Sequence, residues 1–275
     1  MLLSKVYYLA QRPREIAERV QNKMHHLLDC FSPPCGLPIA AGPKDLTARV
    51  AHLLQVPPGL LCVSGELSEL EIHIAKQRSH LLQRPGPFGN FMNGTATLGR
   101  LCYLACRQLR PRVVVETGVA YGVTSAYVLQ ALEDNGYGEL YSIDLPPLGK
   151  DAERYVGYVI PQYLKMRWKL QTGSARSILP QVLRETGNID VFVHDSLHTY
   201  RHMKWEFQSA LQALRPGGLL ISDDIEVNRA FEETIGRPDV EEWVAIREDG
   251  KDAICGAMKV AGVKSKGAIA PHASR

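Results

Sequence analysis

The sequence lacks long apolar runs. No stretch approaches the roughly 20 apolar residues that a membrane-spanning helix needs, so we expect no stable membrane insertion. The N-terminus, MLLSKVYYLAQRPRE, also lacks the apolar core of about 7–15 residues that a secretory signal carries. These two absences predict a cytoplasmic protein.

The sequence also lacks a strong charge of either sign. It has 32 Lys and Arg against 29 Asp and Glu, and the net charge is +3. Binding to phosphates without sequence preference needs basic residues clustered on one face, whereas the Lys and Arg here are scattered. We therefore expect no nucleic-acid partner.

Cysteine pairs of the C-x-x-C type are missing, which argues against a zinc site. Cys102 and Cys106 lie four residues apart in an apolar helical pattern and can share one helix face. We expect reduced, buried cysteines rather than disulfides. The six cysteines are Cys30, Cys35, Cys62, Cys102, Cys106 and Cys255.

What the chain does have is the composition of a folded globule. Of its 275 residues, 45% are hydrophobic and 22% are charged, and such a length buries a sizeable core without disulfides or metal. We predict a helical N-terminal extension over 1–82, which serves oligomerisation or forms a substrate lid, a folded domain over 83–260 and a disordered tail over 261–275. An amphipathic helix over 13–29 suits packing on the domain or on a second subunit, and we expect a homo-oligomer.

From residue 96 onward, apolar strands alternate with helices. Continuous apolar strands separated by helices are typical of a parallel sheet that is covered on both faces. The last two strands lack a long helix between them, so we expect one of them to be antiparallel. The predicted fold is α/β, a doubly wound, seven-stranded and mostly parallel sheet with helices on both faces. The predicted strands cover 112–117, 139–144, 167–171, 190–194, 218–222, 241–248 and 253–260; the predicted helices cover 44–55, 66–83, 96–109, 122–134, 151–160, 175–185, 200–214 and 227–235.

Ligands of open parallel sheets bind outside the carboxyl ends of the strands. The first strand ends in Glu116-Thr117-Gly118-Val119-Ala120-Tyr121-Gly122, a glycine-rich turn that lets the backbone approach a ligand. The spacing is G-x-x-x-G rather than the G-x-G-x-x-G that seats a dinucleotide. The acid before Gly118 would repel a diphosphate, which disfavours NAD and favours a ligand with a positive centre such as S-adenosylmethionine.

The second and third strand ends suggest a nucleoside pocket. Asp144 can accept hydrogen bonds from two ribose hydroxyls, although a turn or helix-capping aspartate is the alternative. Gly173 and Ser174 follow the third strand, where Ser174 can cap the next helix or line an adenine pocket.

Three carboxylates follow the fourth and fifth strands. Asp195, Asp223 and Asp224 converge at one sheet edge, where close like charges raise a pKa or bind a cation such as Mg²⁺. The alternative for Asp223 and Asp224 is one helix cap and one solvated acid.

Three histidines lie in the same stretch of sequence. His198, three residues after Asp195, is a candidate general base, with a structural histidine as the alternative. For His194 and His202 we favour a structural role, because the chemistry needs neither.

Together, the motifs ETGVAYGVTS, SIDLP, W-x-L-x-x-G-S, FVHDSLHTYRHM and LRPGGLLISDD resemble the class I S-adenosylmethionine-dependent methyltransferases. The nearest branch is that of metal-dependent O-methyltransferases of sugars and natural products. The resemblance covers about residues 90–260 and implies a Rossmann-like sheet.

The resemblance also implies roles for individual residues, with Asp223 standing where related sequences use Glu. It places His198 as the base that deprotonates the acceptor hydroxyl, with Asp195 beside it in the catalytic site. The implied cofactor-binding residues are Glu116, Thr117, Gly118, Tyr121, Gly122, Asp144, Gly173, Ser174 and Asp195; the implied metal ligands are Asp195, Asp223 and Asp224.

The function that the resemblance implies is methyl transfer from S-adenosylmethionine to a hydroxyl of a small molecule, a sugar or a natural product, assisted by Mg²⁺ or another divalent cation. Three alternatives stay open. The first is a metal-independent methyltransferase with His198 alone as base. The second is a non-catalytic cofactor-binding module, and the third is an oxidative relative on the same fold.

Overall fold

The computed structural model describes residues 13–29, 35–37, 46–61, 63–84, 86–88, 96–148, 151–247 and 253–262. The predicted tail from residue 263 onward lies outside the described residues, as do Cys30 and Cys62. Within the described part, no helix is both long enough and apolar enough to cross a membrane. Cys102, Cys106 and Cys255 are buried free thiols, as expected, and Cys35 is a partly exposed one.

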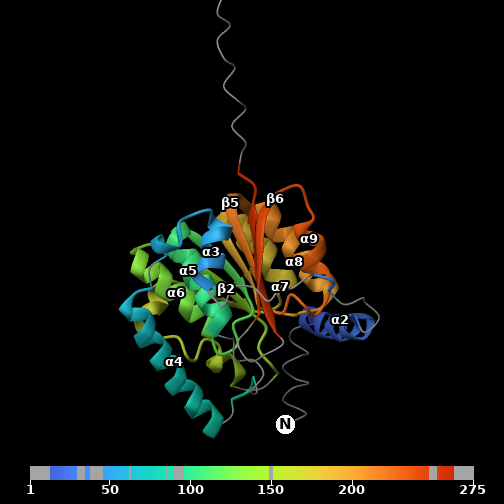
Figure 1. Ribbon diagram of the computed structural model, residues 1–275. Helices are drawn as coiled ribbons and strands as arrows, with labels where there is room; N and C mark the ends of the chain where they lie inside the picture. The colour runs from blue at the N-terminus through green and yellow to red at the C-terminus, as the bar shows by residue number, and fades with distance from the viewer. Residues whose placement is uncertain are drawn as a thin grey trace, which may run out of the picture.

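The centre of the fold is a seven-stranded sheet of order β3-β2-β1-β4-β5-β7-β6 (Figure 1). Strands β1 to β5 pair in parallel, which confirms the predicted mostly parallel sheet. Strand β7 lies between β5 and β6 and is antiparallel to both. A short connection joins β6 to β7, as antiparallel neighbours allow. The strands are β1 (Val113–Thr117), β2 (Glu139–Asp144), β3 (Trp168–Thr172), β4 (Ile189–His194), β5 (Leu214–Ser222), β6 (Val240–Arg247) and β7 (Ile254–Val260).

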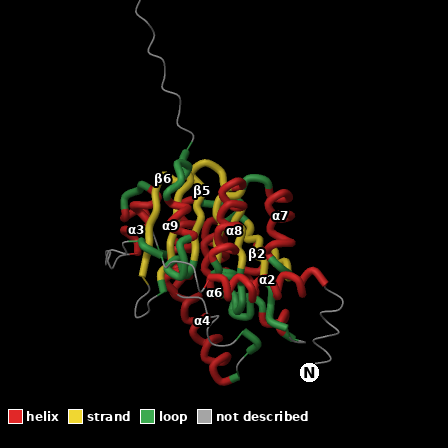
Figure 2. Tube along the Cα trace, turned by 90° about the vertical axis from the view of Figure 1, so that its right-hand side faces the viewer, coloured by secondary structure: helices red, strands yellow, loops and turns green. Residues whose placement is uncertain are grey.

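Helices cover both faces of the sheet, as Figures 1 and 2 show. Helices α3, α4, α5 and α6 pack into one apolar core, and α7, α8 and α9 pack into the other. Because both faces are covered, the central strands are apolar on both sides. The helices are α2 (Pro13–Asp29), α3 (Leu46–Leu54), α4 (Gly65–Gln83), α5 (Ala96–Leu109), α6 (Val123–Asn135), α7 (Ala175–Thr186), α8 (Tyr200–Ala213) and α9 (Ala230–Ile235).

The prediction of a helix over 151–160 is wrong. The chain forms two short 3-10 helices instead, Ala152–Tyr155 and Gln162–Arg167. Gly157 between them has a φ of 70°, and a Cβ atom there would lie 2.2 Å from the Trp168 ring. Pro161 follows and cannot donate a helical hydrogen bond. The result is an irregular segment at the carboxyl end of the sheet.

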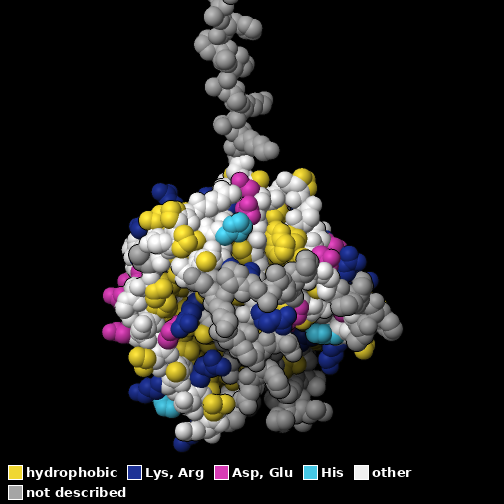
Figure 3. Space-filling model, viewed as in Figure 1, with side chains coloured by type: hydrophobic (Ala, Val, Ile, Leu, Met, Phe, Trp, Pro, Cys, Tyr) yellow, Lys and Arg dark blue, Asp and Glu magenta, His cyan; other side chains and the backbone are white. Residues whose placement is uncertain are grey.

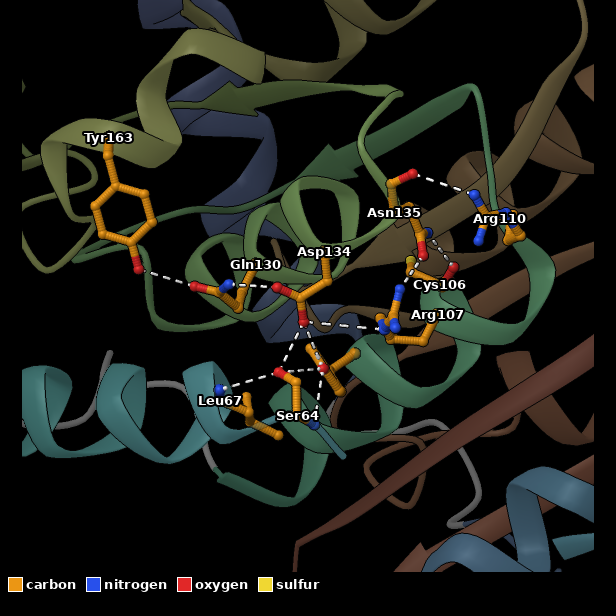
Figure 4. Close-up of polar contacts among 10 residues, drawn as sticks. Ser64, Leu67, Cys106, Arg107, Arg110, Gln130, Asp134, Asn135 and Tyr163 are labelled. Atoms are coloured by element: carbon orange, nitrogen blue, oxygen red, sulfur yellow. Dashed lines mark hydrogen bonds and ion pairs between the residues drawn. The ribbon is translucent and has the colours of Figure 1, made fainter. Parts of the chain in front are cut away.

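Helix α4 is tied to the domain by polar contacts as well as by its buried leucines. The side chain of Ser64 caps α4 at the amide of Leu67 and donates to Asp134 Oδ2 at 2.9 Å. Asp134 also accepts from Gln130, which in turn accepts from Tyr163 (Figure 4). Helices α3 and α4 therefore share one apolar core with the sheet.

Helix α2 forms where the sequence predicts it, but its apolar side faces outward. Val20, Met24 and Leu27 are each more than half exposed. The helix touches the domain through polar groups: Arg19 donates to the carbonyl of Pro146 at 2.7 Å, and Ser177 donates to Glu18 at 3.0 Å. The homo-oligomer remains a prediction.

Candidate functional site

The glycine-rich turn after β1 lies against the end of β4. Gly118 has a φ of 85°, and a Cβ atom built on it would lie 1.8 Å from the backbone oxygen of Asp195. No side chain fits at this position, because the obstacle is backbone rather than a movable side chain. Gly122, with a φ of 86°, approaches Gly157 in the same way. The turn is therefore packed closely against Asp195 and Gly157 at the carboxyl edge of the sheet.

Asp144, at the end of β2, holds this turn in place. Its Oδ2 accepts hydrogen bonds from the amides of Val119 at 2.7 Å and of Ala120 at 2.8 Å. Burial raises the pKa of Asp144, and the two amide hydrogen bonds oppose that rise. Asp144 therefore acts as a turn aspartate in this structure, which is the alternative role expected from the sequence.

Glu116 lies beneath the turn and is fully buried. Its Oε2 accepts hydrogen bonds from Ser125 at 2.6 Å and from Ser142 at 2.7 Å, while its Oε1 has no hydrogen bond among the described residues. Burial raises the pKa of Glu116 to about 7, although the two serine hydroxyls act in the opposite direction. The site therefore contains a carboxyl group that can be neutral near neutral pH.

Of the other residues expected around the turn, Thr117 and Tyr121 are buried and Ser174 is partly exposed. Tyr121 is buried and meets Phe88 edge-on, with 5.2 Å between the ring centroids. Thr117 donates to Glu206 Oε2 at 2.6 Å. The Ser174 hydroxyl caps α7 by accepting a hydrogen bond from the amide of Arg176 at 3.1 Å. Helix capping was one of the two roles expected for Ser174 from the sequence.

The structure brings Asp195, His198 and Asp223 together. One ligand atom from each residue lies within 4.8 Å of the others, a spacing that suits a single metal ion. Burial raises the pKa of Asp195 well above its usual value, and the nearby charges of Asp223 and Glu116 raise it further. Thr124 donates to Asp195 at 3.1 Å. A cation between the carboxylates would relieve their mutual repulsion.

Asp224, predicted as a third metal-binding carboxylate, contacts His198, a member of this group, and its role as a metal ligand stays a prediction. Its carboxylate lies 3.1 Å from His198 Nδ1, and its φ of 46° is in the left-handed region. Burial lowers the pKa of His198, but the hydrogen bond and the negative charge of Asp224 outweigh it, so the pKa is raised. His198 Nε2 has no hydrogen bond within the described part of the chain.

Sequence reasoning missed Glu206, the centre of a buried polar network behind the site. Glu206 is fully buried and bonds to His194 Nδ1 at 2.6 Å and to His202 Nε2 at 2.8 Å. Its pKa is lowered because the two histidines outweigh the effect of burial. The ring of His194 also meets the ring of His198 edge-on at 5.2 Å. The spacing of His202 and Glu206, four residues apart on one helix, was the available signal.

Comparison with known proteins shows what this chain resembles. Residues 115–225 match the family model described as a methyltransferase domain. No curated protein matches the chain.

Solved structures share the fold at low sequence identity. The O-methyltransferase TomG from Streptomyces achromogenes, involved in tomaymycin synthesis and solved with S-adenosylmethionine, is 20% identical with a TM-score of 0.54; the match covers 74% of this chain and 92% of TomG. An O-methyltransferase from Bacillus cereus, solved with S-adenosylhomocysteine, is 18% identical with a TM-score of 0.53, and the match covers 78% and 100% of the two chains.

Proposed function

Because this chain is an S-adenosylmethionine-dependent methyltransferase with the class I fold, we propose that it methylates a hydroxyl group of a small molecule, with His198 as the base and a divalent cation assisting. The acceptor is a sugar or a natural product. The solved relatives that are O-methyltransferases support transfer to oxygen.

The observation that carries the proposal is the pairing of His198 with Asp224. A carboxylate 3.1 Å from Nδ1 favours the tautomer that has its proton on Nδ1. The lone pair is then on Nε2, the nitrogen without a hydrogen bond among the described residues. A histidine in this state can take the proton of an acceptor hydroxyl as the oxygen attacks.

The glycine-rich turn at the carboxyl edge of the sheet is the proposed cofactor site. The turn from Gly118 to Gly122, with Asp144, Gly173 and Ser174 beside it, would hold S-adenosylmethionine, and the carboxyl group of Glu116 lies beneath. When bound, the cofactor supplies a methyl group on a sulfonium, which is already activated for transfer. The chain then has to bring the acceptor oxygen into line with that methyl group and to exclude water.

The donor set also fits a divalent cation. Asp195 and Asp223 would hold it, and it would lower the pKa of the acceptor hydroxyl. Oxygen ligands alone suit Mg²⁺, whereas a His198 nitrogen in the set suits Mn²⁺, Fe²⁺ or Zn²⁺ better. We place His198 as the base, because Asp224 already orients its ring.

The test is cofactor-dependent turnover on a panel of hydroxylated sugars and phenols, with S-adenosylhomocysteine release as the readout. We expect turnover by the wild type, loss of turnover in His198→Asn and unchanged cofactor affinity in that variant. If His198→Asn also abolishes binding of Mn²⁺, His198 is a ligand rather than the base. No turnover of any hydroxylated compound by a cofactor-bound protein would count against O-methylation.

A metal-independent reaction is the second candidate, and the same pairing favours it. The His198–Asp224 pair can act as a base without any cation. Full turnover in EDTA would establish this candidate and remove the metal from the proposal.

A further inference from the structure

A cavity of about 730 Å³ opens between the C-terminal end of α4 and the irregular segment after β2. Arg84 and His80 line it from α4 and its end, and Arg154, Tyr155 and Tyr158 line it from the other side. None of the residues assigned above to the cofactor or to the cation lines it. In Figure 3, basic side chains lie along the part of this face that α4 crosses in Figure 1.

The cavity adjoins the glycine-rich turn. The amide of Gly157 donates to the carbonyl of Ala120 at 3.0 Å, and the amide of Val159 donates to the carbonyl of Tyr121 at 2.9 Å. The segment that carries Tyr155 and Tyr158 is thus fixed to the turn that would hold the cofactor. One wall of the cavity is therefore attached to the proposed cofactor site.

The lining of the cavity favours an anion. Arg84 has no ion pair among the described residues, and Arg154 pairs only with Asp151, at 3.4 Å. That pair is highly exposed, with 83% of the Arg154 side chain accessible, so it contributes little and an incoming anion can compete for it. Two arginines thus face one carboxylate in the cavity wall.

The tyrosines add an apolar face beside the arginines. The rings of Tyr155 and Tyr158 stack with centroids 5.8 Å apart and an angle of 29° between their planes. Such a pair presents flat apolar surface together with two hydroxyls. Sugar and aromatic rings suit a surface of this kind, and a neighbouring arginine can bind a carboxylate or phosphate with two parallel hydrogen bonds.

We propose that this cavity binds an acidic group, a carboxylate or a phosphate, on a ring of the methyl acceptor. The inference rests on the proposed function and deepens it, because it names the chemical class of the acceptor. Arg84 and Arg154 hold the acidic group, and the two tyrosines lie along the ring. The same chemistry also fits a free anion, so the experiment separates the two sources.

The experiment measures calorimetric binding to the full chain, saturated with S-adenosylhomocysteine, at low ionic strength. The probes are 4-nitrophenyl β-D-glucuronide, the matched neutral 4-nitrophenyl β-D-glucoside, and inorganic phosphate. The variants are Arg84→Gln and Arg154→Gln. The control is Arg184→Gln, which removes the same charge from an exposed position on α7, on the other face of the sheet.

We expect the glucuronide to bind at least about tenfold more tightly than the glucoside, since charge-assisted hydrogen bonds are the stronger ones. Arg84→Gln and Arg154→Gln should remove that difference, and Arg184→Gln should keep it. Equal binding of the two glycosides, absence of binding, or an unchanged preference in both cavity variants overturns the proposal. Phosphate binding as tight as that of the glucuronide assigns the cavity to a free anion and also overturns it.

The two proposals fail in different ways. If the chain does not bind S-adenosylhomocysteine, the proposed function fails before the glycosides are tested. If it binds S-adenosylhomocysteine, and if wild type and Arg84→Gln methylate neutral hydroxyl compounds equally well, only the inference about the acidic acceptor fails.

Discussion

His198 Nδ1 lies 3.1 Å from a carboxylate oxygen of Asp224. Asp224 follows β5, and His198 follows β4, so two neighbouring parallel strands bring the pair together. The left-handed φ of Asp224, 46°, is a conformation that aspartate and asparagine tolerate better than most residues. The pair combines a base with the group that orients it.

Asp224→Asn tests this pair without changing the backbone preference. The amide oxygen still accepts a hydrogen bond from Nδ1, but the negative charge that raises the pKa of His198 is lost. We expect the pKa of His198 to fall, so that the acid limb of the rate profile moves to lower pH. The plateau rate should fall about 10- to 100-fold, because the imidazolium that forms loses its counter-charge.

The measurement is the pH dependence of kcat for the wild type and the variant. Unchanged cofactor affinity and an unchanged melting temperature serve as controls. An acid limb at the same pH in both proteins would show that Asp224 does not act through His198.

Glu206 is expected to be essential for stability. Removal of this buried carboxylate leaves His194 and His202 without their shared partner and creates a cavity as well. Glu206→Ala should lower the free energy of unfolding by about 3–5 kcal/mol, the range for breaking a buried charged network. Glu185→Ala, on the exposed face of α7, is the control and should change it by less than about 0.5 kcal/mol. Similar denaturation midpoints for the two variants would contradict this account.

Glu116 should make the cofactor-free protein less stable as the pH rises. Its pKa is about 7 in the folded chain and near 4.5 when unperturbed. Between these values the folded state binds the proton that the unfolded state has lost, so stability falls with increasing pH and then levels off above pH 7. The expected loss attributable to Glu116 is on the order of 3 kcal/mol.

Glu116→Gln removes this titration while it keeps the size of the side chain. Urea denaturation at pH 5 and at pH 8 should show that the substitution is more favourable at pH 8 than at pH 5. The same effect of the substitution at both pH values would mean that Glu116 is ionised throughout.

Gly118→Ala tests the close approach between the turn and β4. The added Cβ atom would meet the backbone oxygen of Asp195, at 1.8 Å in the unchanged geometry. Gly136→Ala is the matched control: Gly136 also has a positive φ, 78°, but nothing lies within 4 Å of the added atom. Gly136→Ala should cost about 1 kcal/mol of unfolding free energy through backbone strain.

Gly118→Ala should cost at least about 2 kcal/mol more than Gly136→Ala and should abolish binding of S-adenosylhomocysteine. Thermal denaturation and calorimetry measure the two effects. A variant that binds this ligand as the wild type does would show that the turn need not have the geometry described.

The sequence predicts the sheet well because the residue patterns that mark each strand are local in the chain. Each central strand is a short apolar run between turn residues, and the order of acids and glycines marks the strand ends. The helix expected over 151–160 failed for a local reason too: Gly157 and Pro161 interrupt it, and its apolar residues pack against the glycine-rich turn instead.

The contacts within the site are harder to predict, because they join residues that are distant in sequence. The sequence places Asp195, His198 and Asp223 at one edge, but it does not show that Asp224 turns toward His198. Nor does it show that His194, on β4, meets Glu206, on α8. Both pairings depend on the register of neighbouring elements, which no local pattern encodes.

The most direct test of the account is calorimetric titration of the metal-stripped full chain with S-adenosylhomocysteine, repeated with Mg²⁺ and with Mn²⁺. We predict binding of S-adenosylhomocysteine in the micromolar range, together with binding of a divalent cation that Asp195→Ala abolishes and the exposed control Asp239→Asn retains. Absence of S-adenosylhomocysteine binding by the folded wild type would contradict the account at its centre, and cation binding that survives Asp195→Ala would contradict the assigned ligands.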